Sequence, residues 1–495
     1  MRDFANLIDG KLVKGSATVP VDNPATGQVI ARAPAATPAE LDQAFAAAAD
    51  AQPGWAADSP AREKAMLAAA DVITAIAGEI AELITLEQGK PLAEAKMEPL
   101  GMAAALRHFA GQRLEPVVLS PAGPEVVVRH RPVGVVAAIT PWNSPVLVAG
   151  MKLSTAWAVG NTVVLKPSPF TPLSTLRMAE ALNDVLPHGV MNVVNGGNEL
   201  GALMTSHPVP RLITFTGSAH TGKLVAQSAG RDLKRTILEL GGNDPAVILD
   251  DASADEIAQA IFWAAFGNGG QTCVAVKRVY VPKILHAEVV DAFTALAEAA
   301  QVGDGMDPAT KIGPLTTPAQ RSIVSDLVED AKAHGARITA GGYEIDGPGY
   351  FYRPAVVDRV TDSTRLVAEE QFGPALPVVE YTSLDEVIRN LNKSMYGLGG
   401  SVWSPDVERA QAVADRLHSG TTWVNCHRAS LWPVQPTAGT GWSGLGSEMG
   451  QWGMAALTDL QVRHTVANVH ASAVGISVAT AAGRPAPGAA ESRKP

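Results

Sequence analysis

Five short apolar stretches recur between residues 134 and 240, and this alternation constrains the fold more than any other feature of the sequence. They read GVVAAI, TVVLKP, MNVVNG, RLITFTG and RTILEL. They return roughly every 25 residues and are separated by segments rich in Ala and Leu that are typical of helices. This pattern predicts an α/β fold with a doubly wound parallel sheet.

Other segments extend the pattern on both sides. Residues 36–110 are expected to be mainly helical, and Thr37 with Glu40 has the spacing of a capping box. Strands are expected within 124–142 and near 457–469, and a second α/β pattern runs from about residue 241 to 440. We expect a disordered tail over 470–495. A chain of 495 residues is expected to form two or three domains.

The composition narrows the class of protein. Hydrophobic residues make up 46% of the chain and charged residues 18%, with a net charge of −10, so we expect a globular protein that does not bind nucleic acid. The N-terminus is charged where a signal peptide would be apolar, and no apolar run approaches the ~18 residues of a membrane helix. We therefore expect a cytoplasmic protein whose two cysteines are thiols.

A glycine-containing loop, RLITFTGSAHTGKL at 211–224, is expected to join a strand to a helix. Such a turn presents backbone N–H groups that suit a phosphate. Gly217, Gly222 and Lys223 fit a P-loop, but Leu224 stands where a magnesium ligand is needed. The dinucleotide fingerprint G-x-G-x-x-G is absent. On these residues alone, an NTPase and an ordinary strand–helix turn both remain open.

One cysteine lies in an unusual place. Cys273 follows the glycines and amides of FGNGGQT, where a ligand could approach the backbone. A small buried hydrophobic residue is the alternative interpretation of a lone cysteine. Cys426, beside His427, has no such setting, and we interpret it as a structural thiol.

Four motifs occur together in one order along the chain: ITPWNSP at 139–145, LELGGNDP at 238–245, GQTC at 270–273 and EEQFGP at 369–374. Together they resemble the aldehyde dehydrogenase superfamily. Further similarities are LEQGKP, VLKPSPFTP, FTGSAHTG, WVN and SGLGSEMGQWG. The resemblance covers about residues 5–469.

The resemblance implies a catalytic set whose chemistry can be checked. An aldehyde gives up hydride readily only after a thiolate has added to it and formed a hemithioacetal oxyanion. Cys273 matches the family's nucleophile, and Asn143 matches the amide that stabilises the oxyanion with the cysteine N–H. Glu239 matches the base that activates water against the thioester; the CoA-acylating branch usually lacks it. Glu448 matches a glutamate near the water path, although a surface carboxylate is an alternative for it.

The resemblance also implies NAD or NADP as the cofactor, and no metal. Lys166 matches the lysine that bonds the adenosine ribose, Gly217 and Ser218 the turn beside the pyrophosphate, and Glu370 the carboxylate that holds the nicotinamide ribose. The remaining implied cofactor residues are Thr140, Trp142, Ser168, Gly201, Leu240 and Phe372.

The chain departs from the family pattern in three places. Pro169 stands where many relatives have a glutamate, and Ser144 stands where they often have an aromatic residue. The usual P-F-G-G-x-K-x-S-G motif is PTAGTGWSG at 436–444, so we expect unusual specificity near the substrate entrance.

The resemblance implies three parts. They are a dinucleotide-binding domain (1–109 and 134–240), a catalytic domain (241–440) and an oligomerisation arm (110–133 and 457–469) that would form a homodimer or homotetramer. The substrate would be a small aldehyde. Two other classes stay open at this point, namely a cofactor-independent thiol ester hydrolase and a non-catalytic protein on the same fold.

Overall fold

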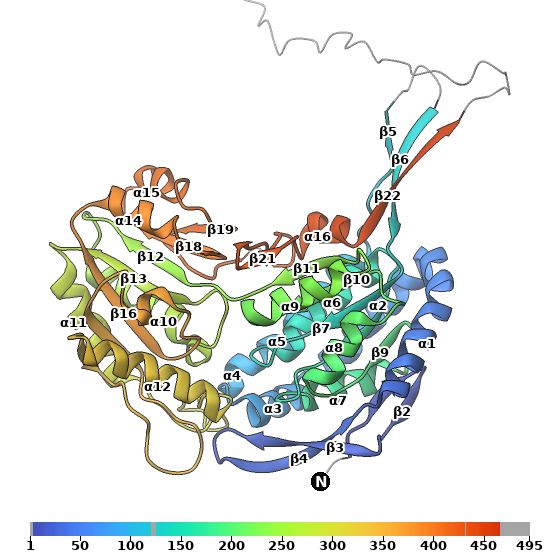
Figure 1. Ribbon diagram of the computed structural model, residues 1–495, viewed down its shortest axis with the longest axis horizontal. Helices are drawn as coiled ribbons and strands as arrows, with labels where there is room; N and C mark the ends of the chain where they lie inside the picture. The colour runs from blue at the N-terminus through green and yellow to red at the C-terminus, as the bar shows by residue number, and fades with distance from the viewer. Residues whose placement is uncertain (1–2, 120–124, 431, 466–495) are drawn as a thin grey trace, which may run out of the picture. The chain divides into compact units, whose positions relative to one another are not determined.

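The computed structural model describes residues 3–119, 125–430 and 432–465. Contacts divide the chain into a large unit and a small one, and the small unit consists of Glu115–Arg129 and the chain from Leu460 onward. The large unit holds two sheets, each covered by helices on both faces (Figure 1).

The first sheet has eight strands in the order β2-β1-β9-β8-β7-β10-β11-β21, and β7 to β11 form its parallel part. The strands are β1 (Asn6–Ile8), β2 (Lys11–Val13), β7 (Val135–Ile139), β8 (Thr162–Lys166), β9 (Met191–Val193), β10 (Leu212–Thr216), β11 (Arg235–Glu239) and β21 (Gly444–Leu445). The chain runs outward from β7 to β9 and then returns to β10 on the other side of β7. The predicted doubly wound parallel sheet is therefore confirmed.

Helices cover this sheet because its strands are buried on both faces. The helices are α1 (Pro38–Ala57), α2 (Ser59–Ala75), α3 (Ala77–Gln88), α4 (Leu92–Ala95), α5 (Met97–Ala110), α6 (Pro145–Ala158), α7 (Leu173–Leu182), α8 (Asn198–Ser206) and α9 (Ala219–Gly230). One apolar cluster contains α2, α3, α5, α6 and α7, and another contains α1, α8 and α9. The predicted helical region and its capping box are confirmed, since Thr37 Oγ1 accepts from Glu40 N at 3.2 Å and Glu40 Oε2 accepts from Thr37 N at 2.7 Å.

The second sheet has seven strands in the order β14-β15-β16-β13-β12-β18-β19. They are β12 (Asp244–Ile248), β13 (Val276–Pro282), β14 (Arg337–Ala340), β15 (Ala355–Val360), β16 (Ala375–Tyr381), β18 (Gly399–Trp403) and β19 (Thr421–Val424). Its helices are α10 (Ala254–Phe266), α11 (His286–Ala299), α12 (Pro318–Ala333), α13 (Arg365–Ala368), α14 (Leu384–Leu391) and α15 (Val407–Ala414). α10 and α11 pack on one face, and α12, α14 and α15 on the other (Figure 1).

Smaller strand pairs complete the described chain. β3 (Ala17–Asn23) and β4 (Gln28–Ala35) form a hairpin, and β17 (Tyr396–Gly397) pairs with β20 (Thr440–Gly441). β5 (Val117–Val118), β6 (Glu125–Pro132) and β22 (Thr458–Thr465) form a three-stranded sheet, so the strand expected near 457–469 exists. The tail expected at 470–495 lies outside the described residues.

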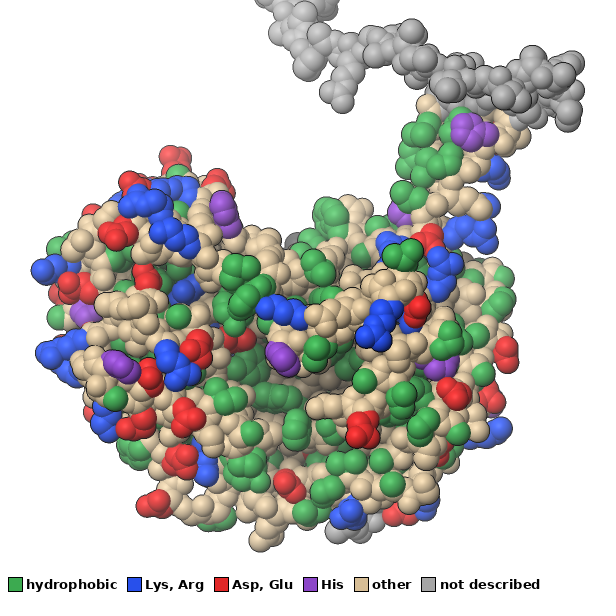
Figure 2. Space-filling model, viewed as in Figure 1, with side chains coloured by type: hydrophobic (Ala, Val, Ile, Leu, Met, Phe, Trp, Pro, Cys, Tyr) green, Lys and Arg blue, Asp and Glu red, His purple; other side chains and the backbone are tan. Residues whose placement is uncertain are grey.

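The surface and the helices also bear on the predicted class. The face in Figure 2 shows basic and acidic side chains interspersed. Among the described helices, none combines the length and apolar character needed to span a membrane.

Candidate active site

Cys273 lies just after a sharp backbone bend. Helix α10 ends at Phe266 and is followed by the short 3-10 helix η1 (Gly267–Gly270), in which Asn268 and Gly269 have φ of 54° and 61°. A Cβ on Gly270 would lie 2.4 Å from the carbonyl oxygen of Gly373, so glycine is required where these two segments cross. Cys273 and Cys426 are both free thiols, as expected.

Asn143 connects the end of the first sheet to this bend. It lies in the turn between β7 and α6, and its Nδ2 donates to the carbonyl of Gln271 at 2.8 Å. Its own carbonyl accepts from Lys90 Nζ at 2.8 Å and from Asn268 Nδ2 at 3.1 Å. Hydrogen bonds to the side chain and to the backbone carbonyl of Asn143 therefore hold this predicted oxyanion residue next to the cysteine bend.

Glu239 is the last residue of β11, directly before the chain crosses into the second sheet. Its side chain is buried, and its Oε1 has no hydrogen-bond partner among the described residues. Burial raises the pKa of Glu239 well above its usual range, the Glu448 carboxylate raises it further, and the Lys152 ammonium opposes both. A buried carboxylate with a free oxygen is poised to take a proton from water.

Glu448 is buried and not at the surface, because it is only 4% exposed. It lies just before α16 (Gly450–Ala456), and its Oε1 accepts from Lys152 Nζ at 2.6 Å and from Thr214 Oγ1 at 2.7 Å. Sequence reasoning missed Lys152. The signal was present, because this lysine stands alone in the apolar helix PVLVAGMKLSTAWA.

Glu370 faces Cys273 from the second sheet's side. Its Oε1 accepts from Gly242 N at 3.1 Å and lies 3.4 Å from Lys277 Nζ. A Cβ on Gly241 would lie 2.0 Å from Glu370 Oε2, so a larger residue there would have to displace the Glu370 carboxylate. Burial raises the pKa of Glu370, while Lys277 and the Gly242 N–H lower it. Lys277, a lysine inside the buried strand β13, was also missed.

These groups act together on the thiol of Cys273. Burial raises its pKa to about 11; Lys277 lowers it, and Glu370, Glu239 and Asp244 raise it. The predicted residues Cys273, Glu239 and Glu370 therefore share one electrostatic environment. His427 serves the same bend, because its Nε2 contacts the Val274 carbonyl at 3.0 Å, and burial lowers its pKa to about 3.

Thr140, Lys166, Gly217 and Leu240 lie at or just after the carboxyl ends of β7, β8, β10 and β11, the edge of the first sheet where a doubly wound fold binds its ligand. Glu370 and Phe372 come from the loop before β16. Gly217 and Ser218 form the turn from β10 into α9, and Ser218 caps that helix by accepting from Thr221 N at 3.2 Å. A Cβ on Gly222 would meet Leu240 at 2.5 Å, so Leu240 packs beneath this helix. The N–H groups at this turn suit a pyrophosphate.

Lys166 lies at the end of β8, and its amine fits a sugar hydroxyl or a phosphate. It is 4% exposed, it donates to the Pro167 carbonyl at 3.2 Å, and burial lowers its pKa to about 8. Gly201 lies against it, since a Cβ there would be 3.9 Å from Lys166 Cε. Ser168 follows in the same loop and accepts from Phe170 N at 3.3 Å.

Two aromatic side chains are in contact between the turn after β7 and the loop before β16. The rings of Trp142 and Phe372 meet edge to face with centroids 5.4 Å apart. Thr140, two residues before Trp142, has a buried Oγ1 without a partner among the described residues.

Lys166, Ser168 and Gly201 form a separate group, with no hydrogen bond or ion pair to Cys273 in the described chain. An extended ligand such as a dinucleotide fits two such groups on one sheet edge.

A family model described as "Aldehyde dehydrogenase family" matches residues 12–462. A betaine aldehyde dehydrogenase of Rhizobium etli (strain CIAT 652) is 40% identical over 458 residues, which cover 90% of this chain and 93% of the relative.

Solved structures give the same family. An NAD⁺ complex of an aldehyde dehydrogenase from Bacillus cereus has a TM-score of 0.92 and 33% identity, and the match covers 94% of this chain and 97% of that one. A structure described as an E. coli NADP dependent enzyme has a TM-score of 0.90 and 33% identity over 93% of this chain and 97% of that one. With the geometry above, these matches show that the chain belongs to the aldehyde dehydrogenase family and is an NAD(P)-dependent aldehyde dehydrogenase.

Proposed function

We propose that Cys273 is the nucleophile of this aldehyde dehydrogenase and that Asn143, Glu239 and Glu448 complete its catalytic set. The observation that carries the proposal is the buried carboxylate of Glu239, which has an unpartnered oxygen and acts electrostatically on the Cys273 thiol. The substrate is an aldehyde, and the product is released as a free carboxylic acid.

The proposed first step is addition of the Cys273 thiolate to the aldehyde carbon, which forms a C–S bond and an oxyanion. Asn143 uses one of its two N–H donors for the Gln271 carbonyl, which leaves the second for that oxyanion. The oxyanion then collapses to a thioester. When bound, the nicotinamide supplies the hydride acceptor for this step.

The proposed second step is hydrolysis of the thioester. Glu239 takes a proton from water, and the hydroxide attacks the thioester carbon, breaks the C–S bond and releases the carboxylic acid and the Cys273 thiolate. Glu448 is fixed by Lys152 and Thr214 and keeps a second oxygen without a partner among the described residues. Because the Glu448 carboxylate acts electrostatically on Glu239, this oxygen is proposed to accept the proton that Glu239 gives up.

The coenzyme is proposed to extend from Lys166, Ser168 and Gly201 at the ribose end, past Gly217, Ser218 and Leu240, to Glu370 and Phe372. The turn at Thr140 and Trp142 would run beside it. The fit is supported by the buried amine of Lys166, with which no carboxylate pairs among the described residues, and by the N-terminus of α9 at Ser218. The coenzyme-binding domain would then be 1–109 with 134–240, and the catalytic domain 241–440.

We also propose that the chain forms a homodimer or homotetramer through the arm, 110–133 with 457–469. Apolar side chains of this arm are exposed, among them Val117, Val118, Leu460 and Val462. An unpartnered apolar strand surface of this kind usually marks an interface. A cytoplasmic location remains a prediction.

The test is formation of NAD(P)H, followed by absorbance, across a panel of aldehydes with the wild type and Cys273→Ala. The variant is expected to lose activity while it still binds the coenzyme. The matched control is Cys426→Ala, which is expected to retain activity. Mass spectrometry of the trapped acyl-enzyme would overturn the assignment if the adduct were on Cys426.

A further inference from the structure

Lys277 occupies a position for which the proposed steps have no role. It lies four residues after Cys273 in β13, a strand that is buried along its whole length, and its side chain is 1% exposed. A buried ammonium is costly unless it is paired and hydrogen-bonded. Its contacts therefore define what it can do.

Those contacts join two segments that are far apart in the sequence. Lys277 Nζ donates to the carbonyl of Thr272 at 2.6 Å and to that of Cys273 at 3.3 Å. The same nitrogen lies 3.4 Å from Glu370 Oε1 and 5.3 Å from the centre of the Phe372 ring. The three N–H donors of one ammonium thus match acceptors on the nucleophile bend and on the Glu370 loop.

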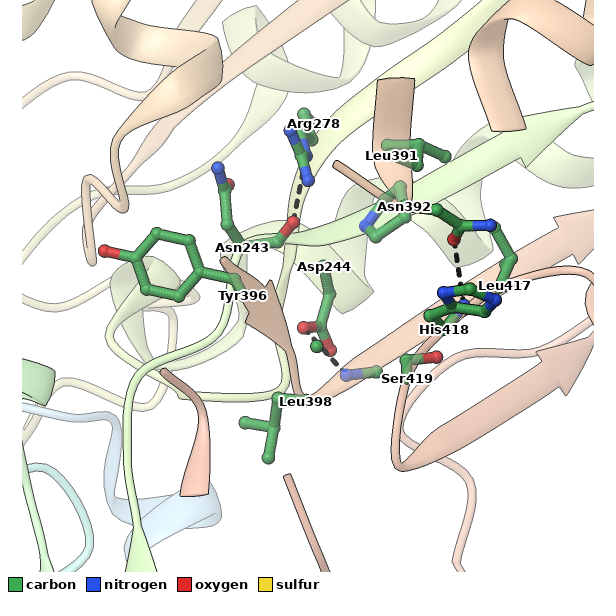
Figure 3. A pocket seen from close by; sticks show the side chains of 13 residues that line it. Asn243, Asp244, Arg278, Leu391, Asn392, Tyr396, Leu398, Leu417, His418 and Ser419 are labelled. Carbon is green, nitrogen blue, oxygen red and sulfur yellow. Dashed lines mark hydrogen bonds between the residues drawn. The ribbon is translucent and has the colours of Figure 1, made fainter. Parts of the chain in front are cut away.

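The Lys277 ammonium affects the Cys273 thiol strongly because negatively charged side chains act on that thiol from several elements. Three carboxylates act on Cys273 and oppose its thiolate: Glu239 from β11, Asp244 from β12 and Glu370 from the loop before β16. Asp244 points into the pocket shown in Figure 3 and accepts from Gly399 N at 3.0 Å. Lys277 on β13 is the cation that favours the thiolate, while Lys152 acts on Glu239 and Arg278 also acts on Asp244.

We propose that Lys277 is a positioning residue that fastens the Cys273 bend to the Glu370 carboxylate, so that the nucleophile and the nicotinamide ribose are set by one shared ammonium. The inference rests on the proposed roles of Cys273 and Glu370. It implies that the thiol's reactivity and the affinity for coenzyme change together when Lys277 is altered. A lysine that only supported the sheet would change neither.

The chain offers a matched control for this distinction. Lys234 is also a buried lysine, with a side chain 4% exposed, and its Nζ donates to the carbonyls of Thr205 and His207 at 3.0 and 2.6 Å. Asp232 lies 3.5 Å from it. Lys234 precedes β11, whereas Glu239 ends that strand. Lys234→Met therefore removes an equivalent set of contacts away from the reacting thiol.

The experiment measures alkylation of Cys273 by iodoacetamide across pH, located by mass spectrometry, and binding of NAD⁺ by titration. Lys277→Met is expected to slow alkylation at pH 8 by about tenfold or more, the effect of one unit on the thiol pKa, and to weaken NAD⁺ binding. Lys277→Arg is expected to recover most of the alkylation rate. Lys234→Met is expected to behave as the wild type does.

The inference is overturned if Lys277→Met alkylates with the same pH profile as Lys234→Met. If Lys277→Met is recovered unfolded, Lys277→Gln compared with Lys277→Arg decides in the same way. Failure of the proposed function would look different, since the wild type would then form no NAD(P)H with any aldehyde. Alkylation does not depend on turnover, so the two failures are separable.

Discussion

The two ends of the proposed coenzyme site use buried lysines in opposite ways. At the reaction end, Lys152 lies 2.6 Å from Glu448, and Lys277 lies 3.4 Å from Glu370. At the adenosine end, Lys166 is just as buried but donates only to a backbone carbonyl, and no carboxylate pairs with it among the described residues. Paired ammonium groups hold the protein's own side chains in place, whereas the unpaired one is available to a ligand.

The largest expected effect concerns the base at the reaction end. Glu239→Gln keeps the shape but removes the proton acceptor, so steady-state turnover should fall by about 10²–10⁴-fold. The first turnover should stay fast and give about one NAD(P)H per active site. Rapid-mixing absorbance measures both phases. Equal loss of the burst and of the steady state would show that Glu239 acts in thiol activation or folding instead.

The next effect tests the pairing itself. Lys152→Met leaves Glu448 buried without its cation, and the free energy of unfolding should fall by about 3–5 kcal/mol. Chemical denaturation followed by fluorescence measures this. The control is Lys14→Met, which removes a pair of the same 2.6 Å length, Lys14–Asp3, that is exposed to solvent and should leave stability unchanged. An equal effect of the two substitutions would contradict the role assigned to burial.

A smaller effect is expected at the adenosine end. Pro169→Glu would place a carboxylate near Lys166, where it can accept ribose hydroxyls and repel a 2′-phosphate. We expect the wild type to use NADP nearly as well as NAD, or better, and the variant to shift toward NAD by about 1.5–3 kcal/mol in kcat/KM. A wild type strongly selective for NAD and indifferent to this change would remove the basis for the prediction.

The smallest expected effect is on the pH dependence of stability. The pKa of Glu239 is raised in the folded state, so the folded protein keeps a proton that the unfolded chain loses above about pH 4.3. This contribution is complete below that pH and disappears as pH rises through the raised pKa. Glu239→Gln lacks this pH-dependent contribution. The Tm of the variant relative to that of the wild type should therefore increase as pH rises. Parallel Tm profiles for the two proteins would argue against a raised pKa.

The sequence predicts the fold because each strand and helix is encoded locally. The five apolar stretches between residues 134 and 240 became β7 to β11, and the capping residues Thr37 and Glu40 begin α1 as expected. Cys273 and Glu239 could also be predicted as candidate catalytic residues from the sequence, because each lies in a short motif, GQTC or LELGGNDP. Their roles are proposals, which the electrostatic effect of Glu239 on the pKa of Cys273 supports.

The missed residues share one cause. Lys152 stands alone in an apolar helix, and Lys277 lies beside Arg278 in an otherwise apolar strand; such a lysine is interpretable only when its partner is known. Glu448, the partner of Lys152, is 296 residues away along the chain. The bond from Asn143 to the Gln271 carbonyl is likewise long-range, with a sequence separation of 128 residues. Contacts of this separation depend on how distant parts of the chain pack together, which no local pattern encodes.

The glycine crossings described above also set limits for anyone who wishes to redirect this enzyme to new substrates. At Gly241 and Gly270 a single added carbon would meet Glu370 Oε2 at 2.0 Å and the Gly373 carbonyl at 2.4 Å. Saturation libraries at these two positions should consist almost entirely of inactive clones. Gly441 is limited in the same way, because its φ is 61° and a Cβ there would lie 2.4 Å from the Met395 carbonyl oxygen. Ser144 is half-buried in the turn before α6, and randomising it is the more productive route to altered specificity.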